Sequence, residues 1–249
     1  MTDSNLASTP VAGQQPTDEP QGDTTGPPSY HNAPRARVDA AQQVLIFGGG
    51  GHAKTCIDVL RQMPGYAIAG VVDAKLPIGS EVMGVPVVGR DTEEDLRRMR
   101  HTGVALAAIG VGAIGNQPLR GTIYQKLKGA GFALPNMIHP RAAIEPSARM
   151  GEGNLILANA VVGSCVRIGS NCIVNAGTVV SHDCSLGNNV HLAPGALLAG
   201  GVSVGSNTLI GMGVTVYLGV QIGSNVQVAN GVTLYRNVSD GTRVRASGA

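Results

Sequence analysis

The sequence of 249 residues is poor in aromatic and in charged side chains. It has no tryptophan, only 3% aromatic and 14% charged residues, and a formal net charge of +2. So small a charge favours neither a nucleic-acid-binding protein nor a membrane-surface protein. No apolar run is long enough for a transmembrane helix, and no basic segment followed by an apolar core indicates a signal peptide. We therefore expect a cytoplasmic protein without membrane insertion.

Cysteine is also scarce, and its spacing does not indicate a metal site. The four cysteines form neither a CxxC pair nor a zinc-type pattern. We therefore expect reduced thiols and no bound metal. The cysteines are Cys56, Cys165, Cys172 and Cys184.

The first segment, residues 1–41, has almost no large apolar side chains. It is rich in Pro, Gly, Gln, Thr, Ser and Asp. Such a composition cannot bury enough surface to offset the entropy of ordering the chain. We predict a disordered tail.

The second segment, residues 42–138, alternates strand and helix patterns. Strands that alternate with helices predict a parallel sheet with right-handed crossovers, so we expect a small Rossmann-like α/β domain. Thr92, followed by three acidic residues, predicts a helix N-cap. The predicted strands are 44–47, 67–73 and 104–110, and the predicted helices follow the glycine-rich segment 48–54 and cover 92–99 and about 118–129.

The third segment, residues 139–249, carries a six-residue repeat. Every sixth residue from Ile144 to Leu234 is aliphatic, at all sixteen positions. Three residues further on, thirteen of sixteen positions are Gly or Asn, which tolerate left-handed backbone. Two columns in phase predict an all-β hexapeptide β-helix of about five coils, with three hexapeptides to a coil. The 18-residue coil is also visible in Asn171, Asn189, Asn207 and Asn225.

One turn of the repeat reads Ser-His-Asp where related turns read Gly-Ser-Asn. One coil above His182 lies Gly200, followed by Gly201. We expect these glycines to leave the space over the imidazole free of side chains and to expose backbone N–H groups there. This arrangement suits acyl transfer, with His182 as general base, Asp183 fixing its tautomer and the Gly200 N–H stabilising an oxyanion. The alternative is a solvated polar corner without chemistry.

A second histidine of the repeat, His191, lies half a coil beyond His182. The two side chains should point apart within one chain. If prisms pack around a threefold axis, His191 of one chain can approach His182 of another. Two histidines and one aspartate across chains could also bind zinc, an alternative with less support because the prism has no third histidine.

The segment GGGGHAK at 48–54 follows a strand and precedes a helix. Its glycines and Ala53 fit the G-x-G-x-x-A form, which lets a phosphate approach a helix N-terminus. Asp73 and Gly110 end later strands at the same crevice. The bulk of His52 crowds a dinucleotide, so we favour a mononucleotide or nucleotide sugar over both a dinucleotide and a plain tight turn. The candidate substrate residues are Gly48, Gly50, Gly51, His52, Asp73 and Gly110.

Taken together, these motifs resemble the bacterial sugar O-acyltransferases of the sialic acid O-acetyltransferase type and the nucleotide-amino-sugar N-acetyltransferases. The resemblance covers residues 43–238. It implies a left-handed parallel β-helix, a homotrimer with its active site between subunits, and acetyl-CoA bound in the groove between adjacent prisms. It is carried by GGGGHAK (48–54), VVD (71–73), MIHPRA (137–142), residues 175–202 and the hexapeptides.

The resemblance also implies roles for single residues. The histidine that matches His182 is the general base, and the acid that matches Asp183 orients it. The histidine that matches His52 lies near the sugar, while the glycine loop and Asp73 hold the nucleotide. Residues at the acetyl-CoA and reaction site are Asn175, His191 and Gly200, to which we add the adjacent Gly201.

Three features depart from the family pattern. The acid after the histidine is Asp183 where several members have Glu. Tyr217 and Tyr235 stand where small residues are usual, and the glycine and proline-alanine ending is missing. The last two differences concern the end of the groove where the CoA adenine would lie.

The leading hypothesis is acetyl transfer from acetyl-CoA to the amino group of a nucleotide-activated sugar. One alternative is O-acetylation of sialic acid or a related sugar. Another is a non-catalytic scaffold in a glycan-assembly complex, and the most distant is a zinc-dependent hydratase.

Overall fold

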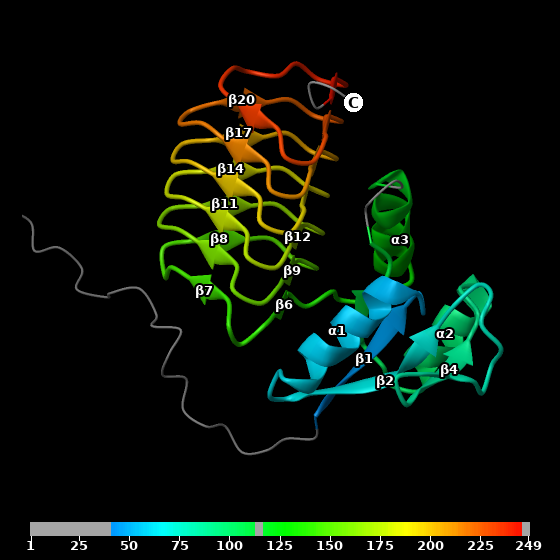
Figure 1. Ribbon diagram of the computed structural model, residues 1–249. Coiled ribbons are helices and arrows are strands. Elements are labelled where there is room, and N and C mark those ends of the chain that lie inside the picture. Colours follow the sequence, from blue (N-terminus) through cyan, green and yellow to red (C-terminus); the bar gives the residue numbers. More distant parts are fainter. Residues whose placement is uncertain (1–40, 113–116, 246–249) are drawn as a thin grey trace, which may run out of the picture. The chain divides into compact units, whose positions relative to one another are not determined.

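The computed structural model describes residues 41–112 and 117–245 (Figure 1). The predicted disordered tail, residues 1–41, lies outside these ranges except for Ala41. No helix in the described ranges is long and apolar enough to cross a membrane.

The N-terminal part is an α/β domain built on a five-stranded sheet with strand order β3-β4-β2-β1-β5. β1 pairs in parallel with β2 and with β5, and β2 pairs in parallel with β4. The three predicted strands and their parallel pairing are confirmed. The strands are β1 (Gln42–Phe47), β2 (Tyr66–Val72), β3 (Glu81–Val82), β4 (Val85–Gly89) and β5 (Leu106–Ile109).

One strand pair differs from the predicted all-parallel sheet, because β3 runs antiparallel to β4. The two residues between them, Met83 and Gly84, have φ angles of 50° and 74°. A two-residue hairpin with left-handed backbone at both positions matches the natural twist of the strands. The sequence hides this hairpin because both strands are short and methionine is uncommon in left-handed backbone.

Three helices cover the two faces of this sheet: α1 (Gly51–Arg61), α2 (Glu93–His101) and α3 (Gln117–Gly129). The alternating side chains of β1 separate the two cores: Val44 and Ile46 pack with α1, whereas Leu45 and Phe47 pack with α2 and α3. α2 begins as predicted, since the Asp95 N–H donates to Thr92 Oγ1 at 3.2 Å.

From β6 onward the chain forms a parallel β-helix of two-residue strands. The strands assemble into three sheets with orders β23-β21-β18-β15-β12-β9-β6, β22-β19-β16-β13-β10-β7 and β20-β17-β14-β11-β8. In Figure 1, β8, β11, β14, β17 and β20 lie one above another. The strands are β6 (Met137–Ile138), β7 (Ala143–Ile144), β8 (Arg149–Met150), β9 (Leu155–Ile156), β10 (Val161–Val162), β11 (Arg167–Ile168), β12 (Ile173–Val174), β13 (Val179–Val180), β14 (Ser185–Leu186), β15 (His191–Leu192), β16 (Leu197–Leu198), β17 (Ser203–Val204), β18 (Leu209–Ile210), β19 (Thr215–Val216), β20 (Gln221–Ile222), β21 (Gln227–Val228), β22 (Thr233–Leu234) and β23 (Arg243–Val244).

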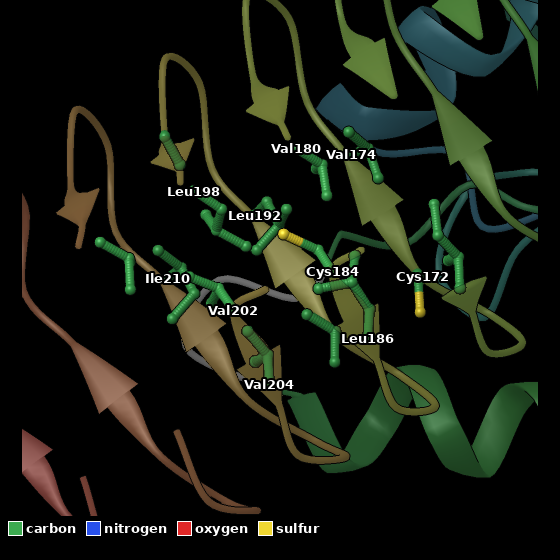
Figure 2. Packing of buried hydrophobic residues seen from close by; sticks show 14 of the residues in the cluster. Cys172, Val174, Val180, Cys184, Leu186, Leu192, Leu198, Val202, Val204 and Ile210 are labelled. Atoms are coloured by element: carbon green, nitrogen blue, oxygen red, sulfur yellow. The ribbon is translucent and has the colours of Figure 1, made fainter. Parts of the chain in front are cut away.

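The predicted aliphatic column forms the core of the β-helix. Fourteen of its sixteen side chains are buried, and the other two, Ile144 and Met150, pack partly buried against them. Figure 2 shows Val180, Leu192 and Leu198 in this core together with Cys184. Cys184 is 1% exposed and belongs to the same core.

The predicted turn column adopts left-handed backbone at fourteen of its sixteen positions, including Cys165 and Asp183 with φ angles of 61° and 60°. Ser147, which is neither Gly nor Asn, does not, and neither does Asn237, where the prediction is wrong. At Asn237 the reason is a shortened last coil: Val238 pairs with Ile222, 16 residues earlier instead of 18. The Asn237 side chain there accepts a hydrogen bond from the Gln221 N–H at 2.9 Å.

One outer face of the β-helix is buried against the α/β domain. Leu155 and Ile173 point outward from β9 and β12, yet both are fully buried in one cluster with Ile57 and Leu60 of α1. His191 is the next residue of the same column, paired with Ile173. This burial determines the environment of one candidate site residue.

Candidate active site

The turn after β13 reads Ser-His-Asp instead of Gly-Ser-Asn, and it places His182 and Asp183 on a rigid corner of the β-helix. Nδ1 of His182 lies 2.8 Å from Oδ2 of Asp183. Both side chains are about two-thirds exposed, at 64% and 66%. The backbone is fixed on both sides, because the Asp183 N–H donates to Ser164 O and the Gly201 N–H to His182 O. Nδ1 is occupied by the carboxylate, which leaves Nε2 free for proton transfer.

Gly200 lies directly against the imidazole of His182. A Cβ atom at this position would lie 2.6 Å from Cε1 and 2.7 Å from Nε2 of His182. A residue without a side chain is needed here, because the ring itself takes the volume that a side chain would fill. Within the described residues the Gly200 N–H has no hydrogen-bond acceptor, whereas its carbonyl accepts from the Gly219 N–H at 3.0 Å. The neighbouring Gly201 is exposed and has a φ of 68°.

His191 and Asn175 meet on another sheet of the β-helix. Nε2 of His191 lies 3.4 Å from Nδ2 of Asn175, and His191 is only 2% exposed. Its other ring nitrogen, Nδ1, is buried without a partner. His182 follows β13 and His191 belongs to β15, so the two histidines lie on different sheets, as expected.

The structure brings His52 close to His191, although the two are far apart in the sequence. His52 lies in the first turn of α1, and its Nε2 is buried without a partner. Burial, followed by the charge of Arg120, lowers the pKa of His52 to about 4. Burial, followed by the charges of His52 and Arg120, lowers the pKa of His191 to about 4. Both imidazoles are neutral at pH 7.

The glycine-rich loop before α1 is shaped by close packing at two positions and is open at two others. Gly48 has a φ of 97°, and its N–H donates to Val72 O at 2.8 Å. A Cβ at Gly110 would lie 2.5 Å from the Gly48 carbonyl oxygen. By contrast, a Cβ at Gly50 or Gly51 would meet nothing within 4 Å, so the N-terminus of α1 is accessible.

Asp73 is tied to this loop. Its carboxylate accepts hydrogen bonds from the N–H groups of Gly49, Lys75 and Leu76 at 2.8, 2.8 and 3.0 Å. Desolvation raises the pKa of Asp73, but the three hydrogen bonds outweigh it, so the pKa lies below its ordinary value. Asp73 thus stays ionised and holds the end of β2 to the loop.

A metal site finds no support in the geometry of one chain. Within residues 41–112 and 117–245, no three His, Cys, Asp or Glu side chains lie close enough together to hold a metal ion.

Known protein families match both the α/β domain and the β-helix. Residues 43–127 match the PglD N-terminal domain. The β-helix matches the bacterial transferase hexapeptide (six repeats) over 147–182, 165–200 and 183–217, and the hexapeptide repeat of succinyl-transferase over 201–236.

Solved structures match most of the chain. Perosamine N-acetyltransferase from Caulobacter crescentus, in complex with CoA and GDP-perosamine, is 40% identical, with 81% of this chain and 92% of that chain covered and a TM-score of 0.75. This chain belongs to the hexapeptide-repeat sugar acyltransferases. The acetyltransferase domain of PglB from Neisseria gonorrhoeae FA1090, in complex with acetyl coenzyme A, is 31% identical over 81% of this chain and 95% of that chain, with a TM-score of 0.74. WeeI from Acinetobacter baumannii AYE, 22% identical over 83% of this chain and 97% of that chain, shares the fold with a TM-score of 0.70.

In this sugar acyltransferase, sequence reasoning missed Arg120 and Asn171 beside the buried histidines. Arg120 is 2% exposed, and its Nε donates to Asn171 O at 3.4 Å. The signal for Arg120 was its helical spacing, because Ile123 and Leu127, three and seven residues on, are buried core residues. The 18-residue spacing marks Asn171 as a turn residue, but it does not show that the side chain contacts Arg120 in α3.

Proposed function

We propose that this acyltransferase transfers an acetyl group from acetyl-CoA to the amino group of a nucleotide-activated sugar. The observation that carries the proposal is the pair of His182 and Asp183, joined at 2.8 Å with Nε2 of the imidazole left free beside Gly200. A histidine held in one tautomer by a carboxylate is suited to general base catalysis. The 40% identical perosamine N-acetyltransferase, solved with CoA and GDP-perosamine, supports the choice of both substrates.

In the proposed reaction, the amine nitrogen forms a bond to the acetyl carbonyl carbon, and the carbon–sulfur bond breaks. Nε2 of His182 accepts the proton that the amine loses, and Asp183 stabilises the imidazolium through Nδ1. The Gly200 N–H donates to the carbonyl oxygen while negative charge develops there. His182 then returns the proton to the departing sulfur, so the products are the N-acetyl sugar and the free thiol of CoA.

The nucleotide of the acceptor is assigned to the loop before α1. Gly50 and Gly51 leave the helix N-terminus open, where backbone N–H groups and the helix dipole favour a phosphate. Gly48 and Gly110 permit the close packing that shapes the loop, and Asp73 holds it in place. His52 lies at the sugar end of this site, next to His191 and Asn175.

We further infer that the β-helix is left-handed, that the α/β domain is Rossmann-like, and that the molecule is a homotrimer. In the trimer, His182 of one subunit would face the sugar site of its neighbour, with acetyl-CoA along the groove that includes Gly200 and Gly201. Exposed apolar side chains near the His182 corner support an interface there. They are Val161, Leu197, Tyr217, Leu218 and Tyr235, each 38–68% exposed.

The test is acetyl transfer by the His182→Ala variant, measured as thiol release from acetyl-CoA with a panel of nucleotide amino sugars. We expect turnover to fall by roughly 10²–10⁴-fold, because the variant lacks its general base. The fold should persist, since the side chain is 64% exposed. Circular dichroism and the oligomeric state of the variant would check this.

His101→Ala is the matched control, because His101 is an exposed histidine at the end of α2. It should retain full turnover. Near wild-type turnover in His182→Ala would rule out the base, and turnover only with hydroxyl sugars would favour O-acetylation. If UDP, GDP, CMP and dTDP all fail to raise the melting temperature, the nucleotide-sugar assignment is wrong. If calorimetry detects no binding of acetyl-CoA, the alternative function as a non-catalytic scaffold in a glycan-assembly complex is favoured.

A further inference from the structure

The buried guanidinium of Arg120 lacks a carboxylate partner among the described residues. Arg120 lies on the inner face of α3 and is 2% exposed. A buried arginine is normally paired with a carboxylate, because burying an unpaired charge is costly. Among the described residues no Asp or Glu forms an ion pair with it, and none contributes to its pKa.

The hydrogen bonds of Arg120 go to backbone carbonyl groups instead. Nη1 donates to Ile109 O at 3.1 Å and to Val111 O at 2.8 Å, at the carboxyl end of β5. Nε donates to Asn171 O in the β-helix, and Asn171 Nδ2 donates back to Arg120 O at 3.3 Å. Arg120 therefore links the α/β domain to the β-helix, but nothing in these contacts neutralises its charge.

Unsatisfied polar atoms cluster around this charge. Within the described residues, four buried side-chain atoms have no hydrogen-bond partner, and each belongs to Arg120, to Asn171 in contact with it, or to one of the two histidines that feel its charge. Buried polar groups without a hydrogen-bond partner are rare in folded proteins, so a cluster of them requires an explanation. The atoms are His52 Nε2, Arg120 Nη2, Asn171 Oδ1 and His191 Nδ1.

The other titratable groups near Arg120 are uncharged. Burial raises the pKa of the Cys56 thiol to about 12, and burial raises that of Cys172 to about 11. Burial lowers the pKa of Arg120 itself to about 10, so it remains charged at neutral pH. α1 thus presents His52 and Cys56, and the β-helix presents Cys172 and His191, all neutral around one positive charge.

We propose that Arg120 is a positioning residue of the acceptor site, where its unpaired buried charge disfavours a second cation beside His52 and His191. The inference rests on the proposed function, which places the acceptor amine next to these histidines. An amine attacks a thioester only as the free base, with its lone pair available. A buried positive charge favours that form over the ammonium ion, because like charges repel strongly at low dielectric.

The experiment compares Arg120→Gln, which keeps hydrogen-bond donors but loses the charge, with Arg120→Lys, which keeps the charge. In Arg120→Gln we expect the acid limb of the kcat–pH profile to move up by about one pH unit or more. In Arg120→Lys the limb should stay where it is in the wild type, even if kcat falls. A purely structural role would lower stability in both variants and leave the limb unmoved in both, which would overturn the proposal.

Histidine titration by NMR tests, without turnover and without a variant of Arg120, whether His52 and His191 are uncharged beside the guanidinium. In the wild type, the resonances of His52 and His191, assigned from His52→Gln and His191→Gln spectra, should stay in the neutral form down to about pH 5. Titration of both near the ordinary histidine value would overturn the proposal, even if Arg120→Gln does not fold. A wild type that transfers no acetyl group but holds both histidines neutral would overturn the proposed function and leave the neutral surroundings of Arg120 standing.

Discussion

At the scale of the residue, Gly200 and His182 compete for the same volume. Gly200 has no left-handed backbone that would require glycine, since it is absent from the residues with positive φ. Its lack of a side chain is instead required by the imidazole of the coil below. Glycine at position 200 is therefore required by the neighbouring imidazole and not by the backbone of the β-helix.

Gly200→Ala should lower turnover while preserving stability. The new methyl group would displace the exposed imidazole of His182, and a shift of about 1 Å at a reacting group can lower turnover by about 10²-fold. The free energy of unfolding should change by less than about 1 kcal/mol, because the imidazole can move into solvent. Turnover and urea unfolding would be measured together.

Gly129→Ala is the control, because a Cβ there would meet nothing within 4 Å. It should leave turnover unchanged. Normal turnover in Gly200→Ala would contradict the proposal that the imidazole of His182, packed against Gly200, is the general base.

The sequence reveals residues that break its own pattern and misses those that become special only through distant contacts. His182 and Asp183 stand out because related turns of the repeat read Gly-Ser-Asn. The proximity of His52 and His191 could not be predicted in the same way. It depends on which outer face of the β-helix the α/β domain covers, and no local periodicity encodes that choice.

At the scale of the element, asparagine side chains join successive turns along one edge of the β-helix. Nδ2 of Asn171 donates to Oδ1 of Asn189 at 2.8 Å, and Nδ2 of Asn189 donates to Oδ1 of Asn207 at 2.9 Å. All three residues have φ angles near 60°. Each asparagine thus serves both as a left-handed turn residue and as a side-chain hydrogen-bond partner.

Two substitutions at Asn189 should separate these contributions. Asn189→Gly removes the side-chain bonds but tolerates the φ of 58°, and should cost about 1–2 kcal/mol of unfolding free energy. Asn189→Ala removes the same bonds and adds backbone strain, so its free energy of unfolding should be lower than that of Asn189→Gly by roughly another 0.5–1 kcal/mol. Urea unfolding midpoints measure both. Equal midpoints would show that the left-handed turn carries no measurable strain.

The repeated elements were predictable, but their exceptions were not. Two columns with a six-residue period predict the coils because inward packing and turn geometry recur together. The β3–β4 hairpin has no such repetition, and its turn uses Met83 in a conformation that methionine rarely adopts. The last coil looks regular through Leu234 and shortens only where Asn237 leaves the left-handed column.

At the scale of the whole molecule, the two buried histidines link stability to pH. Their pKa values are about 4 in the folded chain, against an ordinary value of 6.5. Between these values the unfolded chain binds more protons than the folded chain. The free energy of unfolding is therefore fully retained above pH 6.5 and falls as the pH drops toward 4.

By pH 5 the loss should reach roughly 1–2 kcal/mol for each of the two histidines. Urea unfolding at pH 7, 6 and 5 would measure the slope. His52→Gln should flatten it, whereas His101→Ala, an exposed control, should not. A slope that is unchanged in His52→Gln would show that His52 is not buried in its neutral form.

The shortened last coil also limits how the molecule can assemble. A stack of parallel coils offers unpaired N–H and C=O groups at each end, and such edges can template the addition of another copy. Here the end is uneven, because Val238 pairs with Ile222 after a 16-residue step while β23 extends only the sheet of β21. A second β-helix with regular 18-residue coils would not match the register of this shortened coil. Leaving two residues out of one repeat thus opposes end-to-end polymerisation into fibres.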